Sequence, residues 1–265
     1  MKTVLVTGAN GLLGQKLIAL LSADKTLHTV ATARDTLHAS AGNTTFYPLD
    51  ITDEKQVNEV IAIVKPHVVI NTAAATQVDW CELHPDACFR VNSDAVSFLL
   101  KACEHCGSAF MQLSTDFIFD GSHGPLDENE LPNPVNVYGQ SKLKAEQLVM
   151  QATVPWCIIR TVLVYGVVKP MTRSNIVLWV KESLEQHKKI QVVTDQKRTP
   201  TLAEDLAMGC YLALKHQAAG IYHISGAEMM SPYDIALQTA RFFGLDEQLI
   251  TPVDSTVFRQ PARRP

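Results

Sequence analysis

The 265-residue sequence has no excess of positive charge and no long apolar run, and each absence excludes a class of protein. Its 23 lysines and arginines are outnumbered by 27 aspartates and glutamates, which gives a formal net charge of −4. Binding of nucleic acid through phosphate neutralisation needs a basic surface, so this function is disfavoured. No stretch approaches the roughly 20 apolar residues of a membrane span, and Met1 leads into a strand-like segment without a signal-peptide pattern. We therefore expect a cytoplasmic protein with no nucleic-acid or membrane partner.

Metal-binding patterns are also scarce. The nine histidines are scattered, and the six cysteines include one Cys-x-x-Cys pair, Cys103 and Cys106. That pair could be a redox centre or half of a zinc site, but no second ligand pair follows at finger-like spacing. Because the pair lies late in an apolar-periodic segment, we predict that it packs in the core. We further predict that the cysteines are reduced thiols and that the chain holds no metal.

Apolar residues are plentiful, and they occur in alternating strand-like and helix-like segments. Hydrophobic residues make up 46% of the chain and charged residues 19%, which is enough for a large core. Strand-like segments cover residues 29–33, 45–49, 67–71 and 109–113, and helix-like segments run from Asp53 as a cap to Val64 and over 85–106. This alternation predicts parallel pairing in a doubly wound α/β sheet, which binds ligands at the carboxyl ends of its strands.

The glycine-rich turn near the N-terminus is the motif around which the other segments are organised. Val4, Leu5 and Val6 form a strand-like run, and an apolar-periodic helix-like segment follows the turn directly. Glycines here let the backbone approach a pyrophosphate, whose charge is stabilised by free N–H groups and by the positive end of the helix dipole. We predict a dinucleotide-binding site at this turn. Its candidate residues are Gly8, Asn10, Gly11, Leu12, Leu13 and Gly14.

Two further strand ends bear on the choice of cofactor. Arg34 and Asp35 follow the second strand, where an arginine accommodates a 2′-phosphate and an acidic residue binds a free 2′-hydroxyl. Because Arg34 comes first, we expect NADP, with NAD as the alternative. Asp50 and Ile51 follow the third strand and are placed to meet adenine, although a capping role for Asp50 and Asp53 competes with this interpretation.

The candidate catalytic residues lie in the middle of the chain. Ser114 and Thr115 end a strand, and Tyr138 and Lys142 lie on one face at the start of a helix-like segment. A nearby ammonium lowers the pKa of a tyrosine, and a hydroxyl from Thr115 or Ser114 could hold a carbonyl oxygen beside it. We predict that Thr115, Tyr138 and Lys142 are catalytic. The residues expected at the cofactor here are Ala73, Ala74, Ala75, Ser114, Tyr138 and Lys142.

Longer motifs are spread over nearly the whole chain. They are the Thr-Gly-x-x-Gly-x-x-Gly turn at 7–14 and residues 71–79, 114–121, 136–142, 160–161 and 194–201. This set resembles the extended short-chain dehydrogenase/reductase superfamily and, more narrowly, the dTDP-4-dehydrorhamnose reductase family. The resemblance implies reduction of the C4 ketone of a nucleotide-linked 6-deoxysugar with NAD(P)H. It also implies that Tyr138 donates the proton, Lys142 binds the nicotinamide ribose and tunes Tyr138, and Thr115 hydrogen-bonds the substrate carbonyl.

Two positions depart from the pattern of that family. Leu163 stands where its members commonly have a tryptophan that helps to hold the sugar, and Trp80 stands where a basic residue is usual. The substrate is therefore either this ketosugar, another sugar nucleotide or a smaller ketone. The alternative function is nucleotide binding without turnover, as in the methionine adenosyltransferase regulatory subunit, which is similar to this family.

We expect residues 1–162 to form the Rossmann-type dinucleotide-binding domain and residues 163–265 to form a smaller C-terminal substrate-binding lobe. The two are interleaved in this interpretation, because strands from about 190–226 return to the large sheet. Further helix-like segments cover 176–184 and 202–214, and another begins at the pair Ser231-Pro232, with serine as its cap. In the resembling family more chain follows an Arg-Pro near this end, so we expect the sequence to be incomplete there. A homo-oligomer is compatible with the sequence, which does not reveal the oligomeric state.

Overall fold

A parallel sheet organises the larger part of the molecule. The computed structural model describes residues 1–36, 42–170 and 174–265, and in these residues a seven-stranded sheet has the order β10-β6-β5-β4-β1-β2-β3. Its strands are β1 (Lys2–Thr7), β2 (Leu27–Ala33), β3 (Thr44–Pro48), β4 (Val68–Asn71), β5 (Ala109–Thr115), β6 (Trp156–Thr161) and β10 (Gly220–His223). Each neighbouring pair is parallel. The strand order reverses direction at β1, so the predicted Rossmann-type, doubly wound α/β fold is confirmed.

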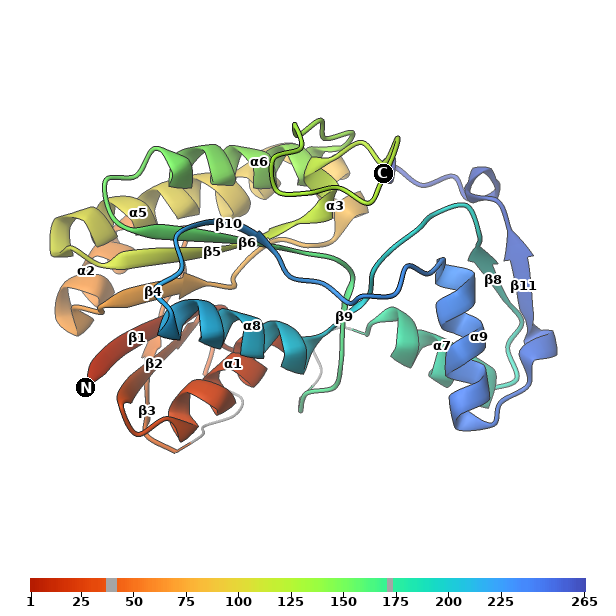
Figure 1. Ribbon diagram of the computed structural model, residues 1–265, viewed down its shortest axis with the longest axis horizontal. Coiled ribbons are helices and arrows are strands. Elements are labelled where there is room, and N and C mark those ends of the chain that lie inside the picture. The colour runs from red at the N-terminus through yellow and green to blue at the C-terminus, as the bar shows by residue number, and fades with distance from the viewer. Residues whose placement is uncertain (37–41, 171–173) are drawn as a thin grey trace.

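Helices cover both faces of this sheet (Figure 1). Helices α1 (Leu12–Ala23) and α8 (Ala203–Lys215) pack together on one face. The other face carries α2 (Glu54–Val64), α5 (Ala95–Cys106) and α6 (Val137–Met150). A buried apolar cluster fills the space between sheet and helices on each side. The central strands are mostly apolar because both of their faces are buried.

The helical run predicted over residues 85–106 is present, but it is not one regular α-helix. Helix α4 (Pro85–Phe89) continues through a π-helical turn (Arg90–Asp94) into α5, and a short helix, α3 (Val78–Leu83), precedes it. The π turn carries the buried amide of Asn92. A π turn inserts one residue into the helical repeat, so it changes the direction in which the side chains on either side point.

Side-chain caps fix where several helices begin. Asp53 accepts hydrogen bonds from the amides of Lys55 (3.0 Å) and Gln56 (3.1 Å) at the start of α2. Ser231 and Asp234 cap each other's backbone amides at the start of α9 (Pro232–Phe243). Both predicted caps are confirmed, because in each case a short polar side chain satisfies amides that have no partner within the helix.

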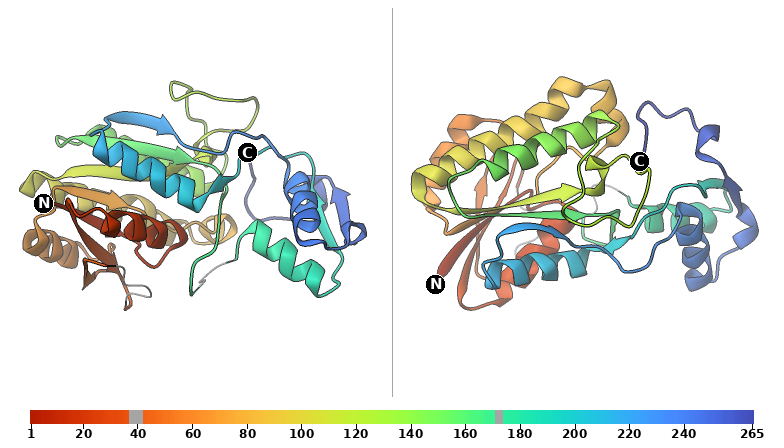
Figure 2. Two further views of the ribbon diagram at one scale, coloured as in Figure 1. Left: turned by 60° about the horizontal axis from the view of Figure 1, so that its bottom comes forward. Right: turned by 45° about the horizontal axis from the view of Figure 1, so that its top comes forward.

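A smaller lobe lies beside the larger sheet at one end of the molecule (Figures 1 and 2). It contains α7 (Ile176–Glu185), α9 and a two-stranded parallel sheet of β8 (Ile190–Val193) and β11 (Ile250–Val253). An apolar cluster of its own joins these elements. The expectation that strands from about 190–226 return to the large sheet is wrong for β8, which pairs with β11 instead. Of the described strands in that range, β10 returns to the large sheet, beside β6.

The cysteine thiols of the described chain are free. Cys103 is buried against the sheet as predicted, whereas Cys106 is exposed near the end of α5, so the packing prediction is wrong for Cys106. Within the described ranges, no three His, Cys, Asp or Glu side chains gather as a metal site would require. No described helix combines the length and apolarity needed to cross a membrane.

Candidate active site

The glycine turn has the geometry that an anion-binding loop requires. Gly8 has a φ of +67°, and a side chain there would lie 2.8 Å from the amide nitrogen of Ala73. A side chain on Gly14 would overlap the carbonyl oxygen of Gly8. Helix α1 begins after Gly11, which supplies no side-chain cap, and its first turn holds no acidic residue. Its first amides and the positive end of the helix dipole are therefore placed to bind a phosphate.

The segment after β2 is tied to the glycine turn. The side-chain amide of Asn10 donates to the carbonyl oxygen of Thr36 (3.0 Å), which follows Arg34 and Asp35. Both Arg34 and Asp35 are exposed. The predicted determinants of the cofactor thus lie beside the turn that would bind the phosphates, and their charged groups face solvent.

Asp50 has a structural role in addition to its position beyond β3. Its Oδ1 atom accepts hydrogen bonds from the amide (2.9 Å) and the hydroxyl (2.8 Å) of Thr52. Asp53 caps α2, so the capping interpretation applies to Asp53, while Asp50 closes a local turn. Ile51 is buried in the core beside them. Asp50 also lines an open hollow of about 850 Å³ on the surface near α2 and α5, which includes Arg90.

Asn92 was missed by the sequence predictions, and it fixes the loop after β4. Its side chain accepts a hydrogen bond from the amide of Ala75 (2.8 Å) and donates to the carbonyl oxygen of the same residue (3.0 Å). It also donates to the hydroxyl of Ser141 on α6 (3.0 Å). The loop of Ala73, Ala74 and Ala75 is thereby held in register with the helix that carries Tyr138. The sequence around Asn92, Arg90-Val91-Asn92-Ser93-Asp94, is polar and gave no signal that this side chain would be buried.

Tyr138 and Lys142 lie one turn apart on α6, close to the end of β5. Asn136 caps this helix by accepting from the amide of Gly139 (2.8 Å), and the absence of a side chain at Gly139 lets the helix contact the carbonyl oxygen of Phe117. Tyr138 is only 8% exposed, and its ring meets that of Phe117 edge to face at 5.5 Å. Lys142 is 3% exposed and donates to the carbonyl oxygen of Leu113 (2.6 Å).

The structure distinguishes the two candidate hydroxyl groups. The hydroxyl of Thr115 donates to Oδ1 of Asp116 (3.1 Å), and Thr115 acts to lower the pKa of the Tyr138 phenol. Ser114 precedes it in the same strand, and consecutive strand residues point to opposite faces. The hydroxyl of Ser114 is buried and has no hydrogen-bond partner among the described residues. Since buried polar groups are normally paired, this hydroxyl fits a site for a polar ligand group.

Burial dominates the ionisation of the two side chains on α6. It raises the pKa of Tyr138 well above its usual value, and the hydrogen bond from Thr115 opposes this only in part. Burial also lowers the pKa of Lys142 to about 8, against the opposite influence of Glu146. The expectation that Lys142 lowers the pKa of Tyr138 is therefore wrong for this structure, because the cost of placing either charge in a dry site is the larger effect.

A buried polar chain connects the glycine-turn strand with Lys142. The hydroxyl of Thr7 donates to Asn71 Oδ1 (2.6 Å), whose amide donates to Gln112 Oε1 (2.9 Å). The amide of Gln112 donates to the carbonyl oxygen of Leu113 (2.7 Å), which also accepts from Lys142. Gln112 was not among the predicted residues, although an amide inside an apolar strand is an unusual feature. This series of hydrogen bonds, which spans β1, β4 and β5, orients Lys142.

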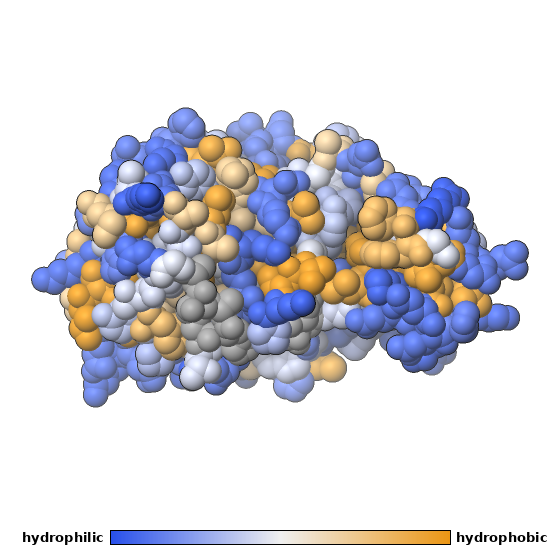
Figure 3. Space-filling view, turned by 90° about the horizontal axis from the view of Figure 1, so that it is seen from below, coloured by the Kyte–Doolittle hydropathy of each residue, from blue (hydrophilic) through white to orange (hydrophobic). Residues whose placement is uncertain are grey.

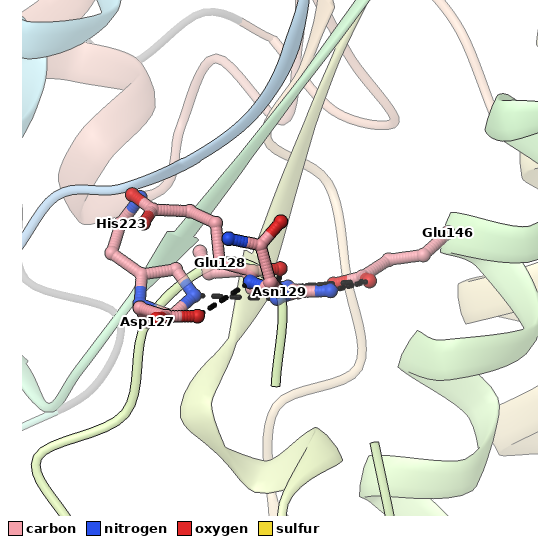
Figure 4. Close-up of polar contacts among 6 residues, drawn as sticks. Asp127, Glu128, Asn129, Glu146 and His223 are labelled. Atoms are coloured by element: carbon pink, nitrogen blue, oxygen red, sulfur yellow. Dashed lines mark hydrogen bonds and ion pairs between the residues drawn. The ribbon is translucent and has the colours of Figure 1, made fainter. Parts of the chain in front are cut away.

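A second buried network of polar side chains connects α6 with neighbouring strands (Figure 4). The guanidinium of Arg160 at the end of β6 contacts the carboxylate of Glu146 on α6 at 2.8 Å, and both side chains are almost completely buried. Arg160 also contacts the Nε2 atom of His223 (3.3 Å), and Glu128 accepts from the amide of His223 (2.8 Å). Burial lowers the pKa of His223. This network joins α6, β6, β10 and the loop that contains Glu128.

The segment 262–265 packs across the start of α6. Arg264 makes a two-pronged ion pair with Asp79 on α3, with N–O distances of 2.6 and 2.8 Å. The carbonyl oxygen of Arg263 accepts from the side chain of Asn136 (2.7 Å), the cap of the helix that carries Tyr138. The last residue, Pro265, lies against Gly121. Residues distant in sequence therefore meet at one edge of the candidate site.

The two positions that depart from the family pattern lie at different places. Trp80 stacks on His84 of the same helical region, with ring centroids 5.0 Å apart. Leu163 follows β6 with a φ of +38°, which is strained for a branched residue. It precedes β7 (Val164–Tyr165), which pairs with β9 (Thr201–Leu202).

A groove of about 670 Å³ lies between the large domain and the lobe. Apolar side chains gather at this junction when the molecule is seen from the side of α1 and α8 (Figure 3). The lining comes from β7, β9, α7 and α9 and from the segment after β10, and it includes Tyr165, Met230 and Phe243. Thr115, Tyr138 and Lys142 do not contribute to the described lining.

Comparison with known proteins identifies relatives along the entire chain. The family model described as RmlD substrate binding domain matches residues 1–265. The beta subunit of methionine adenosyltransferase 2 of Bos taurus is 31% identical over 262 residues, which are 97% of this chain and 77% of that protein. A probable low-salt glycan biosynthesis reductase of Haloferax volcanii is 32% identical over 273 residues, covering 98% and 86%. The dTDP-4-dehydrorhamnose reductase of Bacillus anthracis in complex with NADP has a TM-score of 0.87 at 29% identity, covering 100% and 89%.

Proposed function

Because this chain belongs to the family described as RmlD substrate binding domain, we propose that it is an NADPH-dependent reductase that converts a ketone into an alcohol. The observation that supports the proposal is that Tyr138 and Lys142, both buried and one turn apart on α6, lie beside the end of β5, where Lys142 donates to the carbonyl oxygen of Leu113. The substrate is the C4 ketone of a nucleotide-linked 6-deoxysugar. The similarity to a dTDP-4-dehydrorhamnose reductase and to a probable glycan biosynthesis reductase supports this choice.

The cofactor would be held along the carboxyl ends of β1, β2, β4 and β5. The uncapped N-terminus of α1 would bind the pyrophosphate, and Arg34 the 2′-phosphate. The unpartnered hydroxyl of Ser114 and the ammonium of Lys142 would meet polar groups at the nicotinamide end. The remaining residues that we assign to this site are Gly8, Asn10, Gly11, Leu12, Leu13, Gly14, Asp50, Ile51, Ala73, Ala74, Ala75 and Tyr138.

The chemistry falls into a hydride transfer and a proton transfer. When bound, NADPH supplies the hydride to the ketone carbon. The oxygen then needs a proton, and Tyr138 donates it, because burial raises the pKa of the phenol and keeps it protonated at neutral pH. Thr115 orients the reacting oxygen beside Tyr138. Lys142 fixes the cofactor ribose and is itself oriented by the carbonyl oxygen of Leu113.

A second candidate function is binding without turnover, as a regulatory subunit. The 31% identity to the beta subunit of methionine adenosyltransferase 2 favours it, and so do Trp80 and Leu163, which depart from the reductase pattern. Intact Thr115, Tyr138 and Lys142 favour the reductase.

Consumption of NADPH and NADH by the purified full chain, measured against a panel of nucleotide-linked 4-ketosugars, separates the two functions. The reductase proposal predicts oxidation of reduced cofactor with at least one ketosugar, and no oxidation without it. Cofactor binding is measured in parallel by calorimetry. Tight binding with no turnover across the panel would favour the regulatory function.

A further inference from the structure

Three polar side chains form a row across the buried sheet face that packs against α5 and α6. Thr7, Asn71 and Gln112 are register partners on β1, β4 and β5, and each is almost completely buried. Phe110 belongs to the apolar cluster beneath these helices. Because side chains alternate between the two faces of a strand, Gln112 points to the same side as Phe110. The core on this face therefore changes from apolar to polar near the carboxyl ends of the strands.

The direction of the hydrogen bonds in this row is set by its last acceptor. The carbonyl oxygen of Leu113 can only accept, so Gln112 presents its amino group to it (2.7 Å) and its own oxygen to the amide of Asn71 (2.9 Å). Asn71 then presents its oxygen to the hydroxyl of Thr7 (2.6 Å). Gln112 is thus held at both ends, and its amide cannot turn over without leaving buried polar groups unpaired.

Lys142 shares the carbonyl oxygen of Leu113 with Gln112. Its Nζ atom lies 2.6 Å from this oxygen, which is the hydrogen-bond partner that the described part of the chain gives the ammonium. A carbonyl oxygen has two lone pairs, and Gln112 occupies one of them, so the ammonium is confined to the other side. Since an ammonium has three N–H donors, two of them remain for a ligand.

We propose that Gln112 is a positioning residue of the reductase site, which directs the ammonium of Lys142 toward the ribose hydroxyls of the cofactor. This inference rests on the proposed reduction with NADPH, in which Lys142 binds that ribose. With Gln112 in place, the ammonium approaches Leu113 from one side, and its remaining N–H groups have a fixed direction. Without the Gln112 amide, the ammonium can move across the oxygen. Gln112 therefore acts through Lys142 and not on the reacting atoms.

Packing alone does not require an amide at position 112. A buried amide is tolerated only when its hydrogen bonds are satisfied, and here that takes further polar side chains on two neighbouring strands. Methionine has nearly the length of glutamine and would fill the same space with no polar group to pair. The placement of the ammonium on the shared carbonyl oxygen accounts for a polar row at this level of the core.

A double-mutant cycle tests whether Gln112 acts through Lys142. Calorimetry gives the Kd for NADPH of wild type, Gln112→Met, Lys142→Met and the variant with both changes. Gln112→Met should raise the Kd about tenfold, as for loss of a hydrogen bond to a charged group, but less than about twofold in the Lys142→Met background. The matched control is Gln191→Met, an exposed glutamine on β8, which should leave the Kd unchanged. An unchanged Kd in Gln112→Met, or an equal effect in both backgrounds, would overturn the proposal.

A second variant covers the case in which Gln112→Met does not fold. Gln112→Glu keeps an acceptor for Asn71, but as a carboxylate it has no hydrogen to donate to Leu113, and it attracts the ammonium away from the carbonyl oxygen. The Kd for NADPH should again rise about tenfold. A role confined to the contact with Asn71 would leave the Kd of this variant at the wild-type value, which would contradict the proposal.

Crystal structures of wild type and of either variant, without cofactor, examine the ammonium independently of NADPH binding. In the variant, Lys142 Nζ should leave the carbonyl oxygen of Leu113 or occupy more than one position. An Nζ atom that keeps its wild-type place in the variant would overturn the positioning role. A displaced Nζ in the variant, together with a wild-type chain that does not bind NADPH, would instead refute the proposed function alone.

Discussion

At the scale of single residues, the ionisable side chains of the site are buried, and burial shifts their pKa values. Tyr138 and Lys142 are both almost fully enclosed, and burial favours the neutral form of each. For Tyr138 the neutral form is the acid that the reaction needs. For Lys142 the neutral form is not the one that binds a ribose, so its charge is maintained at a cost to the folded state, with the carbonyl oxygen of Leu113 as partial compensation.

The first prediction at this scale is that Lys142→Met raises stability while removing activity. Burial lowers the pKa of Lys142 to about 8, below its unfolded value. The unfolded chain therefore binds the proton more readily, and the charged lysine destabilises the fold at neutral pH. We expect the free energy of unfolding at pH 7 to increase by about 1 kcal/mol or more, and the gain to shrink as the pH rises above about 8. Urea unfolding at pH 7 and at pH 9 measures the gain in stability and its decrease. A variant less stable than wild type at pH 7 would contradict the reasoning.

The second residue-scale prediction concerns Arg34. Arg34→Ala should weaken NADPH binding much more than NADH binding, because only NADPH carries the 2′-phosphate. A charge-assisted hydrogen bond contributes roughly 1.5–3 kcal/mol, so the ratio of the two dissociation constants should change by about tenfold or more. Calorimetric titration of both cofactors measures this ratio. An unchanged ratio would show that Arg34 is only a solvated charge.

At the scale of elements, the network behind α6 depends on a neutral histidine. The Nε2 atom of His223 faces the guanidinium of Arg160 at 3.3 Å, so it must act as an acceptor. This assigns the hydrogen of the neutral ring to Nδ1. Protonation would place a second positive charge against Arg160. The contacts between β6, β10 and the loop around Glu128 therefore depend on pH.

The stability of this region should fall in mild acid. Because burial lowers the pKa of His223, the unfolded chain binds the proton more readily, and stability is lost as pH falls below about 6.5. Wild-type protein should lose more stability between pH 7 and pH 5 than His223→Gln does. Thermal unfolding across this range provides the comparison, with exposed His216→Gln as control. Parallel pH curves for wild type and His223→Gln would exclude a role for this histidine.

The order of the helices and strands and most of their boundaries could be predicted from the sequence, because apolar periodicity and capping residues are local signals. Asp53 and Ser231 were read correctly for that reason. The pairing of β8 was predicted wrongly, because an apolar strand of four residues contains no information about its partner strand. The roles of Asn92 and Gln112 also depend on contacts between distant segments. The ionisation of Tyr138 could not be predicted from its spacing to Lys142, because burial outweighs that spacing.

At the scale of the whole molecule, the segment 262–265 follows the lobe and packs on the larger domain. Arg264 pairs with Asp79 on α3, and Arg263 accepts from the cap of α6. The position of the lobe is thereby coupled to the helix that carries Tyr138. A shift of this segment would alter the start of α6 without any change in the catalytic side chains.

We predict that Asp79→Asn loosens this edge of the molecule. The Arg264 guanidinium lowers the pKa of Asp79, so the stability that the pair contributes is present at neutral pH and is lost as pH falls below about 4. Hydrogen exchange at pH 7 should become faster in the backbone of 262–265 and at the start of α6. Asp94→Asn serves as the exposed control. Unchanged exchange at both places would show that the ion pair holds nothing in position.

The most direct measurement of the central claim follows the hydride itself. NADPH carrying deuterium at the nicotinamide C4 position is incubated with a nucleotide-linked 4-ketosugar and the purified chain, and the product is examined by mass spectrometry and NMR. With wild-type protein, deuterium should appear at C4 of the sugar alcohol. Tyr138→Phe should form this product about 10² to 10⁴ times more slowly. A deuterated cofactor that stays bound and unconsumed, or a Tyr138→Phe variant as fast as wild type, would contradict the account.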